Sequence, residues 1–496
     1  MTARARERRA RWTFALVASL FGCARQSPPP APPAAPAQIE RTRACHYDVG
    51  VHDPSHMELE VHARCDGDEV IAFEAAEGQA AAYVKHVVDG HGRPIARDAA
   101  RFTLPKGAPH AISYRIDLDA VAAEAKNADV CLRTGDAWIA AGSTFLLQPI
   151  RPHGSTAIHV HVSTPPDVPF STGMRRSGEG YRMRAAEISQ ATYSIFGRFD
   201  REEVRVPGPL SQDEELRPLD APPESVIEIV TLPGHLAVRG PALSRWVREA
   251  AMAVSDFWRG FPIGRTLLVI IPREDYHTVV HGKVVSAGGP SVVIHLGGQA
   301  HEQNLYRDWI LIHEFFHLGV PSFVEEGKWL DEGLATYFEP IIRARAGWRS
   351  ERAVWREFAF DMDQGLDAVQ EVGVELDKSY RGIYWGGAII ALLADVRTRA
   401  RTEGRLGLED GLRAVLARGG DASQVWSLEE VIGTIDETLG APTLASLAEA
   451  HAYGGKPIDF YGLLRELGVT RLGTSVALDN RARLASVRRS ILEPPL

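Results

Sequence analysis

The sequence contains little cysteine, no long apolar run after its first segment, and no strong basic cluster outside that segment. Four cysteines are few for a secreted chain, and neither their spacing nor their neighbours suggest a cysteine metal site. The best later apolar runs, Leu267 to Ile271 and Ala388 to Ala394, have the length of core elements and are too short to cross a bilayer. A formal net charge of −9 and a pI near 6.1 argue against nucleic acid as a partner.

The amino terminus has the pattern of a secretory signal. Five arginines precede the apolar run from Trp12 to Phe21. This segment ends in Leu20-Phe21-Gly22-Cys23, which resembles a bacterial lipobox and makes residues 1–23 a lipoprotein signal peptide. Phe21 is unusual there, so ordinary signal cleavage is the alternative. We expect a lipid on Cys23, a proline- and alanine-rich tether over 24–40, and a protein in the bacterial cell envelope, facing the periplasm or the surface.

Residues 41–205 are predicted to form an N-terminal β-sandwich. Met57 to Ala63, Ile112 to Leu118 and Ala157 to Val162 alternate polar and apolar residues between turn signals. His159 and His161 fall on one face of their strand, at a spacing that suits a metal. The sequence supplies no third ligand, so an exposed strand face is the favoured interpretation.

The remaining cysteines all lie in this part of the chain. Cys45, Cys65 and Cys131 allow at most one intramolecular disulfide, and the sequence does not say which pair forms it.

Prolines and acids without apolar periodicity place a linker at 206–224. Strands are expected at Ser225 to Leu232, Leu267 to Ile271 and Ser291 to Leu296, with a helix from Leu243 to Phe257. A small sheet beside helices suits a thermolysin-like catalytic domain, assigned to 225–387. Residues 388–496 have a helical pattern throughout and form the expected C-terminal α-helical region.

The segment DWILIHEFFHLGVPSFVEEGKWLDEGLATYFEPI, which begins at Asp308, carries the chemistry. His313 and His317 are four residues apart on an apolar helix, so both rings can face one point. Two neutral imidazoles suit zinc, which needs one more protein ligand in a catalytic site. Glu314 lies beside the first histidine, close enough to take a proton from water at the metal. The alternative is a buried helix whose histidines only make hydrogen bonds.

Glu332 is the predicted third ligand. It lies near the start of a second expected helix, Trp329 to Phe338, and can point back at the first. Glu325 and Glu326 are nearer in sequence, but Pro321 and its neighbours mark that region as a turn, where charges are usually solvated.

HEFFH followed by WLDEGLATYF is similar to the gluzincin metallopeptidases, in particular the glycyl aminopeptidase family, with the aminopeptidase N and leukotriene hydrolase group more distant. The resemblance implies His313, His317 and Glu332 as ligands of one zinc ion (Zn2+) and Glu314 as catalytic base. The spacer of 14 residues between His317 and Glu332 is shorter than in aminopeptidase N relatives. The resemblance also implies that Tyr384 donates to the oxyanion, with Tyr380 in reserve.

Two further expectations follow from the same resemblance. The family's amine-binding glutamate is expected within Gly288 to Val292, where Ser291 stands instead, so aminopeptidase and endopeptidase activity remain alternatives. A different acid, such as Glu325 or Glu326, is a second source of amine binding. Glu339, beyond the third ligand, is a candidate to orient a ligand or an exposed helix charge.

Taken together, the sequence predicts an α+β multidomain protein and a membrane-anchored zinc metallopeptidase acting on a peptide or protein substrate. The alternative is a non-catalytic surface lipoprotein that binds a partner through its β domain and keeps the metallopeptidase fold as a scaffold. The four motif residues, His313, Glu314, His317 and Glu332, are all present, which counts against that alternative.

Overall fold

The computed structural model of the chain describes residues 43–67, 70–76, 78–151, 156–209, 224–323 and 326–493. The predicted signal peptide, the lipid site at Cys23 and the tether lie outside the described residues. So do most of the predicted linker and the candidate acid Glu325.

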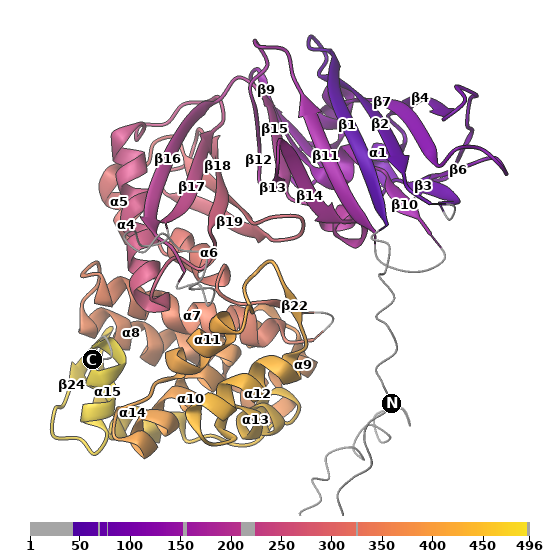
Figure 1. Cartoon of the computed structure of the whole chain (residues 1–496). Helices are drawn as coiled ribbons and strands as arrows, with labels where there is room; N and C mark the ends of the chain where they lie inside the picture. The colour runs from indigo at the N-terminus through magenta and orange to yellow at the C-terminus, as the bar shows by residue number, and fades with distance from the viewer. Residues whose placement is uncertain are drawn as a thin grey trace, which may run out of the picture. The chain divides into compact units, whose positions relative to one another are not determined.

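The amino-terminal third is built on a seven-stranded sheet with the strand order β13-β14-β11-β1-β2-β7-β4 (Figure 1). Its strands are β1 (Ala44–Asp53), β2 (Glu58–Cys65), β4 (Val84–Asp89), β7 (Ala111–Asp117), β11 (Ala157–Ser163), β13 (Arg175–Ser177) and β14 (Gly180–Arg184). The three strands that the alternating pattern predicts are present as β2, β7 and β11. Along β1 and β2 buried apolar side chains alternate with polar ones, because successive side chains of a strand point to opposite faces.

Two four-stranded sheets contribute to the same apolar core as the buried face of this sheet. One has the order β10-β3-β6-β5, with β10 (Gln148–Ile150), β3 (Ala72–Glu74), β6 (Arg101–Thr103) and β5 (Arg97–Asp98). The other has the order β12-β15-β9-β8, with β12 (Phe170–Thr172), β15 (Tyr193–Gly197), β9 (Ala137–Ala141) and β8 (Cys131–Thr134). Short helices connect them: α1 (Gly78–Ala81), α2 (Leu118–Ala125), α3 (Gly142–Phe145) and the 3-10 helix η3 (Ala185–Gln190).

Cys45 and Cys65 form the disulfide. They are direct partners in the antiparallel register of β1 and β2, so the pairing of the two strands brings them together. Cys131 is buried with a free thiol. The sequence left this choice open because it does not reveal which strands pair.

A five-stranded sheet follows, with the order β16-β17-β18-β20-β19. Its strands are β16 (Asp200–Pro207), β17 (Glu224–Thr231), β18 (Arg265–Arg273), β19 (Val279–Val285) and β20 (Ser291–Gly297). The expected boundary between residues 205 and 206 therefore falls inside β16, which belongs to this sheet. Eight register pairs with β17 hold β16 there, so the chain enters the second sheet before the proline-rich segment.

Apolar side chains cover both faces of the five-stranded sheet. On one face, residues of β17, β18 and β20 share a small core with β9 and β15 of the amino-terminal part. On the other face, β16 and β17 pack into a large core with the helices α4 (Pro241–Trp258) and α6 (Ile310–His317). The sheet thus supports the helix that carries the two motif histidines.

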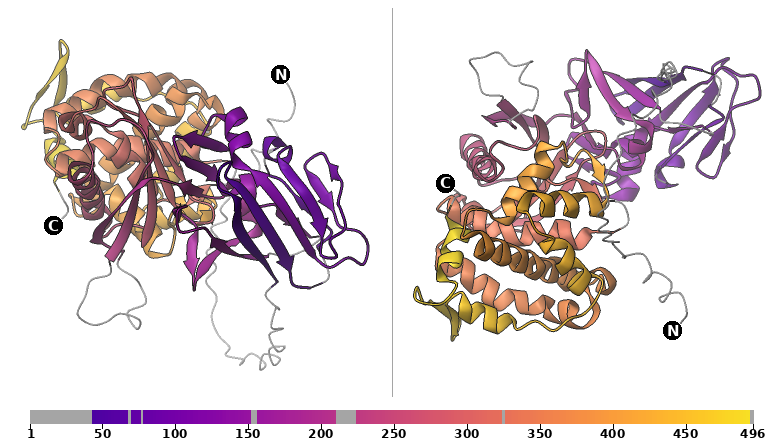
Figure 2. Two further views of the ribbon diagram at one scale, coloured as in Figure 1. Left: turned by 90° about the horizontal axis from the view of Figure 1, so that it is seen from above. Right: turned by 60° about the horizontal axis from the view of Figure 1, so that its bottom comes forward.

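The rest of the chain is mainly helical (Figure 2). The helices are α5 (Glu302–Arg307), α7 (Lys328–Arg345), α8 (Glu351–Asp361), α9 (Val374–Asp377), α10 (Gly387–Thr402), α11 (Leu408–Ala417), α12 (Leu428–Leu439), α13 (Thr443–Leu447), α14 (Phe460–Glu466) and α15 (Ala485–Leu492). Shorter pieces are the 3-10 helix η5 (Met362–Gly365) and the π-helices η6 (Ala368–Val372), η7 (Gly382–Gly386) and η8 (Ala448–Ala452). Two small sheets pair β21 (Ser322–Phe323) with β22 (Val425–Trp426) and β23 (Val469–Leu472) with β24 (Ser475–Leu478).

One hydrophobic core runs through the helices on both sides of the expected boundary at 387/388. At that boundary α10 packs closely on α7, because Gly387 has no side chain and lies directly against the backbone carbonyl of Trp329. This contact holds the start of α10 beside the first turn of α7. In the chain, α7 is the helix that follows the HEFFH helix α6. In the described part of the chain, no helix combines the length and apolar character needed to cross a membrane.

Candidate metal centre

The helix α6 is apolar on nearly every side, which is why it lies inside the protein. All its residues from Ile310 to Phe316 are buried, and His317 is half-buried. Just before the helix, the carboxylate of Asp308 accepts a hydrogen bond from the backbone N–H of Ile310 at 2.8 Å. A histidine pair on a helix in this environment needs compensation for its polar atoms.

The second helix, α7, supplies the third side chain. The Nε2 atoms of His313 and His317 lie 3.1 Å apart. One oxygen of Glu332 lies 3.3 Å from the first of these nitrogens and 3.5 Å from the second. Among the described residues this is the one group of three side chains whose candidate metal-binding atoms all lie within 4.8 Å of one another.

The three separations fit a zinc ion. A tetrahedron whose corners lie about 2.0–2.1 Å from its centre has edges of about 3.3 Å, and zinc binds imidazole nitrogen and carboxylate oxygen at about that radius. The observed edges of 3.1, 3.3 and 3.5 Å bracket this value. The other nitrogen of His313, Nδ1, is buried and has no hydrogen-bond partner among the residues that the structure describes. The residues present therefore fit one zinc ion held by two Nε2 atoms and a carboxylate.

Asp331 supports this group, and sequence reasoning missed it. Its carboxylate lies 2.6 Å from Nδ1 of His317 and so fixes which nitrogen faces the other ligands. Burial opposes a charge on His317, but the carboxylate of Asp331 outweighs it and raises the pKa of His317 well above its usual value. The sequence does contain a signal for this role. Asp331 is an acid in the first turn of α7 and directly precedes the predicted ligand Glu332.

The electrostatics of the group favour a bound cation. Burial lowers the pKa of His313. Burial also opposes ionisation of Glu332, yet the hydrogen bonds from His313 and His317 prevail and lower the pKa of its carboxyl. The amine of Lys328 lies 3.8 Å from the second oxygen of Glu332. The carboxylates of Asp331 and Glu332 thus lie close to the two imidazoles. A dication bound here would neutralise the negative charge of these two carboxylates.

Glu314 lies beside the candidate metal ligands and against the edge strand β19 of the sheet. It is 8% exposed, and burial raises the pKa of its carboxyl to about 7. Gly282 of β19 packs directly on it, since a Cβ at residue 282 would stand only 2.7 Å from its Oε1. A carboxyl with a pKa near neutrality can both accept and return a proton at physiological pH.

Tyr384 also lines the site, next to the candidate ligand His313. It belongs to the π-helix η7, whose extra residue per turn is a feature often found at functional sites. Its ring stacks on that of His313 at 6.1 Å between centroids, and burial together with the charge of Glu332 raises the pKa of its phenol. Tyr380 stacks on Tyr384 at 4.3 Å but is 63% exposed.

Glu339 does not reach the metal ligands. It is buried, and its carboxylate accepts a hydrogen bond from Arg343 at 2.9 Å on the same helix. The exposed-charge role considered for it is therefore wrong, because Glu339 is buried in an ion pair with Arg343. The role of orienting a ligand stays a prediction.

A pocket of about 570 Å³ opens over these side chains. Glu314 and the three candidate ligands line it, with Tyr384 on one side and residues 281–284 of β19 on another. None of the described residues that line it comes from 288–292. Ser291 is instead fully buried and hydrogen-bonded to Thr192. The predicted location of an amine-binding residue is therefore wrong, because β19, and not the segment 288–292, is the part of the five-stranded sheet that borders the pocket.

Of the two alternative acids, Glu326 does line the pocket. It is exposed, and the phenol of Tyr453 donates to it at 3.3 Å.

No protein-family model matches the sequence, and no match was found among the curated proteins. Solved structures do match in fold, and they include aminopeptidase N family proteins and zinc metallopeptidases of the M1 group. The aminopeptidase N family protein of Idiomarina loihiensis matches with a TM-score of 0.62 and 14% identity, over 86% of this chain and 78% of that chain. This chain therefore has the mixed α/β multidomain fold of that protein.

Two more structures are similar at a lower level. The M1 zinc metallopeptidase of Deinococcus radiodurans has a TM-score of 0.49 and 13% identity, over 84% of this chain and 93% of that chain. Aminopeptidase A of Legionella pneumophila, solved in complex with aspartic acid, has a TM-score of 0.49 and 13% identity, over 83% of this chain and 49% of that chain.

Proposed function

We propose that the protein is a zinc-dependent metallopeptidase that hydrolyses peptide bonds with water. One observation supports this most strongly. His313, His317 and Glu332 form a triangle with the edges expected of zinc ligands, and Glu314 lies beside it in an open pocket. The shared fold with an aminopeptidase N family protein supports the same function.

The roles of the side chains follow from their positions. A zinc ion held by the three ligands supplies Lewis acidity, which makes water a nucleophile near neutral pH. Glu314 takes a proton from the attacking water and delivers it to the leaving amine, as its pKa of about 7 permits. Tyr384 donates a hydrogen bond to the oxygen that becomes negative as the carbonyl carbon turns tetrahedral. Asp331 holds His317 in place.

The strand β19 provides a place for the substrate backbone. It is the last strand of the five-stranded sheet, and residues 281–284 line the pocket. A peptide can extend such an edge as an additional strand, so that its backbone hydrogen bonds hold it across the site. The absence of a side chain at Gly282 lets that strand lie directly over Glu314. This arrangement would set a scissile carbonyl near the metal ligands without requiring a free amino terminus.

Metal analysis combined with peptide hydrolysis tests this function. Purified full-length protein should contain at least one zinc per chain and cleave peptides, and a chelator should abolish cleavage until zinc is restored. Comparing amino-terminally blocked with free peptides of one sequence separates endopeptidase from aminopeptidase activity. Protein that holds zinc at full occupancy yet cleaves neither series at any pH between 5 and 9 would contradict the proposal.

Attachment to a membrane through a lipid on Cys23, and location in the bacterial cell envelope, complete the proposed function. They are supported by the sequence pattern of residues 1–23. Expression in a bacterial host with a radioactive fatty acid should label the wild type and not Cys23→Ser. Equal labelling of both would overturn the anchor while leaving the peptidase proposal intact.

A further inference from the structure

The fold gives His159 and His161 the neighbours that the sequence could not supply. Both lie on the outer face of β11, and β1 pairs with this strand in parallel. In that register His46 stands beside His159, and Asp48 stands beside His161. The two strands are more than a hundred residues apart in the chain. We call these four side chains, His46, Asp48, His159 and His161, the histidine patch.

The geometry of the histidine patch suits shared binding of one ligand. The rings of His46 and His159 stack with centroids 5.1 Å apart and an angle of 14° between their planes. Two histidines at positions i and i+2 of a strand, with a third on the adjacent strand, form a triangle on one sheet face. A hollow of about 190 Å³ opens here, lined by the four side chains of the patch and by Ser177, Gly180 and Tyr181.

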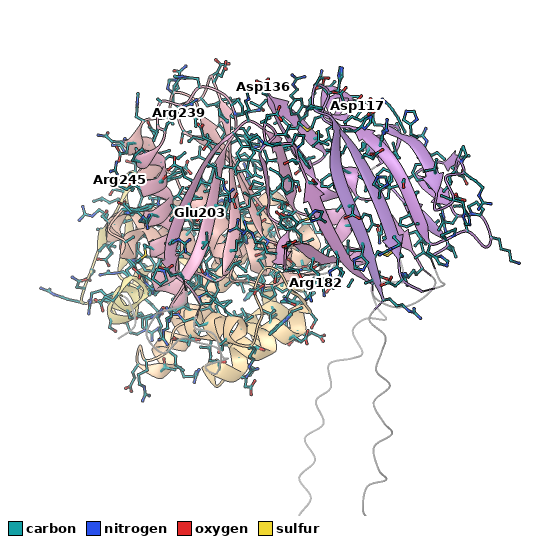
Figure 3. The ribbon with its side chains drawn as sticks, turned by 45° about the horizontal axis from the view of Figure 1, so that its top comes forward. Asp117, Asp136, Arg182, Glu203, Arg239 and Arg245 are labelled. Atoms are coloured by element: carbon teal, nitrogen blue, oxygen red, sulfur yellow. A yellow bond between two sulfur atoms is a disulfide. The ribbon has the colours of Figure 1, made fainter. Side chains whose placement is uncertain are left out.

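The surroundings of one ring, that of His159, favour the state that a metal requires. A metal-binding imidazole must be unprotonated. Burial, with contributions from His46 and Arg182, lowers the pKa of His159. Arg182 lies opposite His159 on β14 and is labelled in Figure 3. Asp66 adds negative charge, with its carboxylate 3.8 Å from Nε2 of His46.

The patch differs from an ordinary charged sheet surface in its composition. Typical exposed strand faces mix lysine, glutamate and threonine, whereas this hollow gathers three imidazoles and a carboxylate. Unlike the metal ligands on α6 and α7, these side chains do not converge in the described residues, so binding requires them to rotate. His46 is 44% exposed and Asp48 is exposed, and side chains at such a surface move readily between rotamers.

We propose that the histidine patch binds one divalent transition-metal ion, of the zinc and copper class that imidazole ligands favour, as a second site separate from the candidate metal centre. His46, His159 and His161 supply nitrogen ligands, and Asp48 supplies an oxygen. The proposal goes beyond the peptidase function and does not depend on it, because its ligands come from β1 and β11 alone.

Metal titration of untagged full-length protein tests this site. Each protein is first stripped with a chelator and then titrated with zinc by calorimetry and metal analysis. The wild type should bind two equivalents, and the double variant His46→Ala/His159→Ala should bind one. The matched control His91→Ala/His235→Ala removes two exposed histidines from other places and should still bind two. Peptide cleavage should be equal in all three proteins.

Copper provides a second measurement that is independent of the candidate metal centre. In a His313→Ala/His317→Ala background, which removes both imidazoles of the candidate metal centre, one equivalent of Cu2+ should give an electron paramagnetic resonance spectrum with coupling to imidazole nitrogens. Adding His46→Ala/His159→Ala should remove that coupling and weaken copper binding about 100-fold or more. Retention of the second zinc equivalent and of the nitrogen coupling in the patch variants would overturn the proposal, as would a wild type that binds only one equivalent.

Discussion

Two groups of histidines in this protein differ in how their positions are fixed. On α6, His313 is buried and His317 is half-buried, and both already lie within 3.5 Å of Glu332. On the seven-stranded sheet, His46 and His159 are exposed or half-buried and meet only because β1 and β11 pair. Helical spacing alone brings the first pair together, whereas the second pair depends on long-range strand pairing. The first group should therefore bind tightly with little movement, and the second more weakly.

Replacing Glu314 should have the largest effect. Glu314→Gln removes the proton acceptor but keeps the size of the side chain and leaves the three candidate metal ligands intact, so kcat should fall about 1000-fold while zinc content stays equal to that of the wild type. Steady-state peptide hydrolysis and metal analysis measure the two quantities. The control Glu302→Gln changes an exposed carboxylate on α5 and should behave as the wild type. Unchanged turnover in Glu314→Gln contradicts the assignment of this residue as the base.

The helical support of the candidate metal centre should be sensitive to acid. Glu409 is buried, and although burial opposes its ionisation, Arg399 and Arg345 prevail and lower its pKa to about 2. A lowered pKa means that the carboxylate stabilises the fold above its unfolded pKa near 4.5 and loses this contribution as the pH falls towards 2. The contribution lost is about 3 kcal/mol.

Glu409→Gln isolates this contribution. The unfolding free energies of wild type and variant, from urea titrations, should differ most at pH 7, and the difference should shrink as the pH falls from 5 to 3. Glu437→Gln, which alters an exposed partner of Arg418, should change little at any pH. A difference between wild type and Glu409→Gln that does not vary with pH contradicts the assignment.

Substitutions of Tyr384 and Tyr380 by phenylalanine distinguish the proposed oxyanion donor from the tyrosine that stacks on it. Tyr384→Phe should lower kcat about 100-fold with little change in KM, because the hydrogen bond forms only as charge develops. Tyr380→Phe should lower kcat less than about threefold, since its phenol is mostly exposed. Parallel kinetics on one peptide decide between them. A larger effect at residue 380 would exchange the two roles.

Replacing Asp331 should have a smaller effect than replacing Glu314 or Tyr384, and this effect is on zinc affinity. Asp331→Asn keeps an oxygen that can accept from His317 but removes a charge, so zinc affinity should fall about tenfold. Competition with a fluorescent chelator measures it, and Glu326→Gln at the pocket rim serves as control. Equal affinities of wild type and Asp331→Asn would show that the hydrogen bond to His317 does not support the site.

The sequence predicts local geometry better than long-range pairing. The four-residue spacing on α6 and the position of Glu332 near the start of α7 require only helix geometry, and the structure brings these side chains together. The third ligand of the sheet histidines, the disulfide partner of Cys45 and the placement of β16 all depend on which strands pair. No local pattern encodes that, because pairing partners are set by the packing of the whole sheet.

The pocket wall illustrates the same limit. The glycines at 288–289 fit the glycine-rich segment that the resemblance implies, yet the strand over Glu314 is β19, in which Gly282 is the residue that permits close approach. Both segments contain glycine and valine, and only the antiparallel pairing of β19 with β20 shows which of them faces the site. Sequence spacing alone predicted residues 288–292 at the edge of the pocket, whereas residues 281–284 of β19 line it.

The most direct test of the metal centre is diffraction from crystals of the protein, measured on both sides of the zinc absorption edge. The anomalous difference map should show one strong peak about 2.0–2.2 Å from Nε2 of His313, Nε2 of His317 and a carboxylate oxygen of Glu332. A zinc peak elsewhere, with the carboxylate of Glu332 directed away from both imidazoles, would contradict the account.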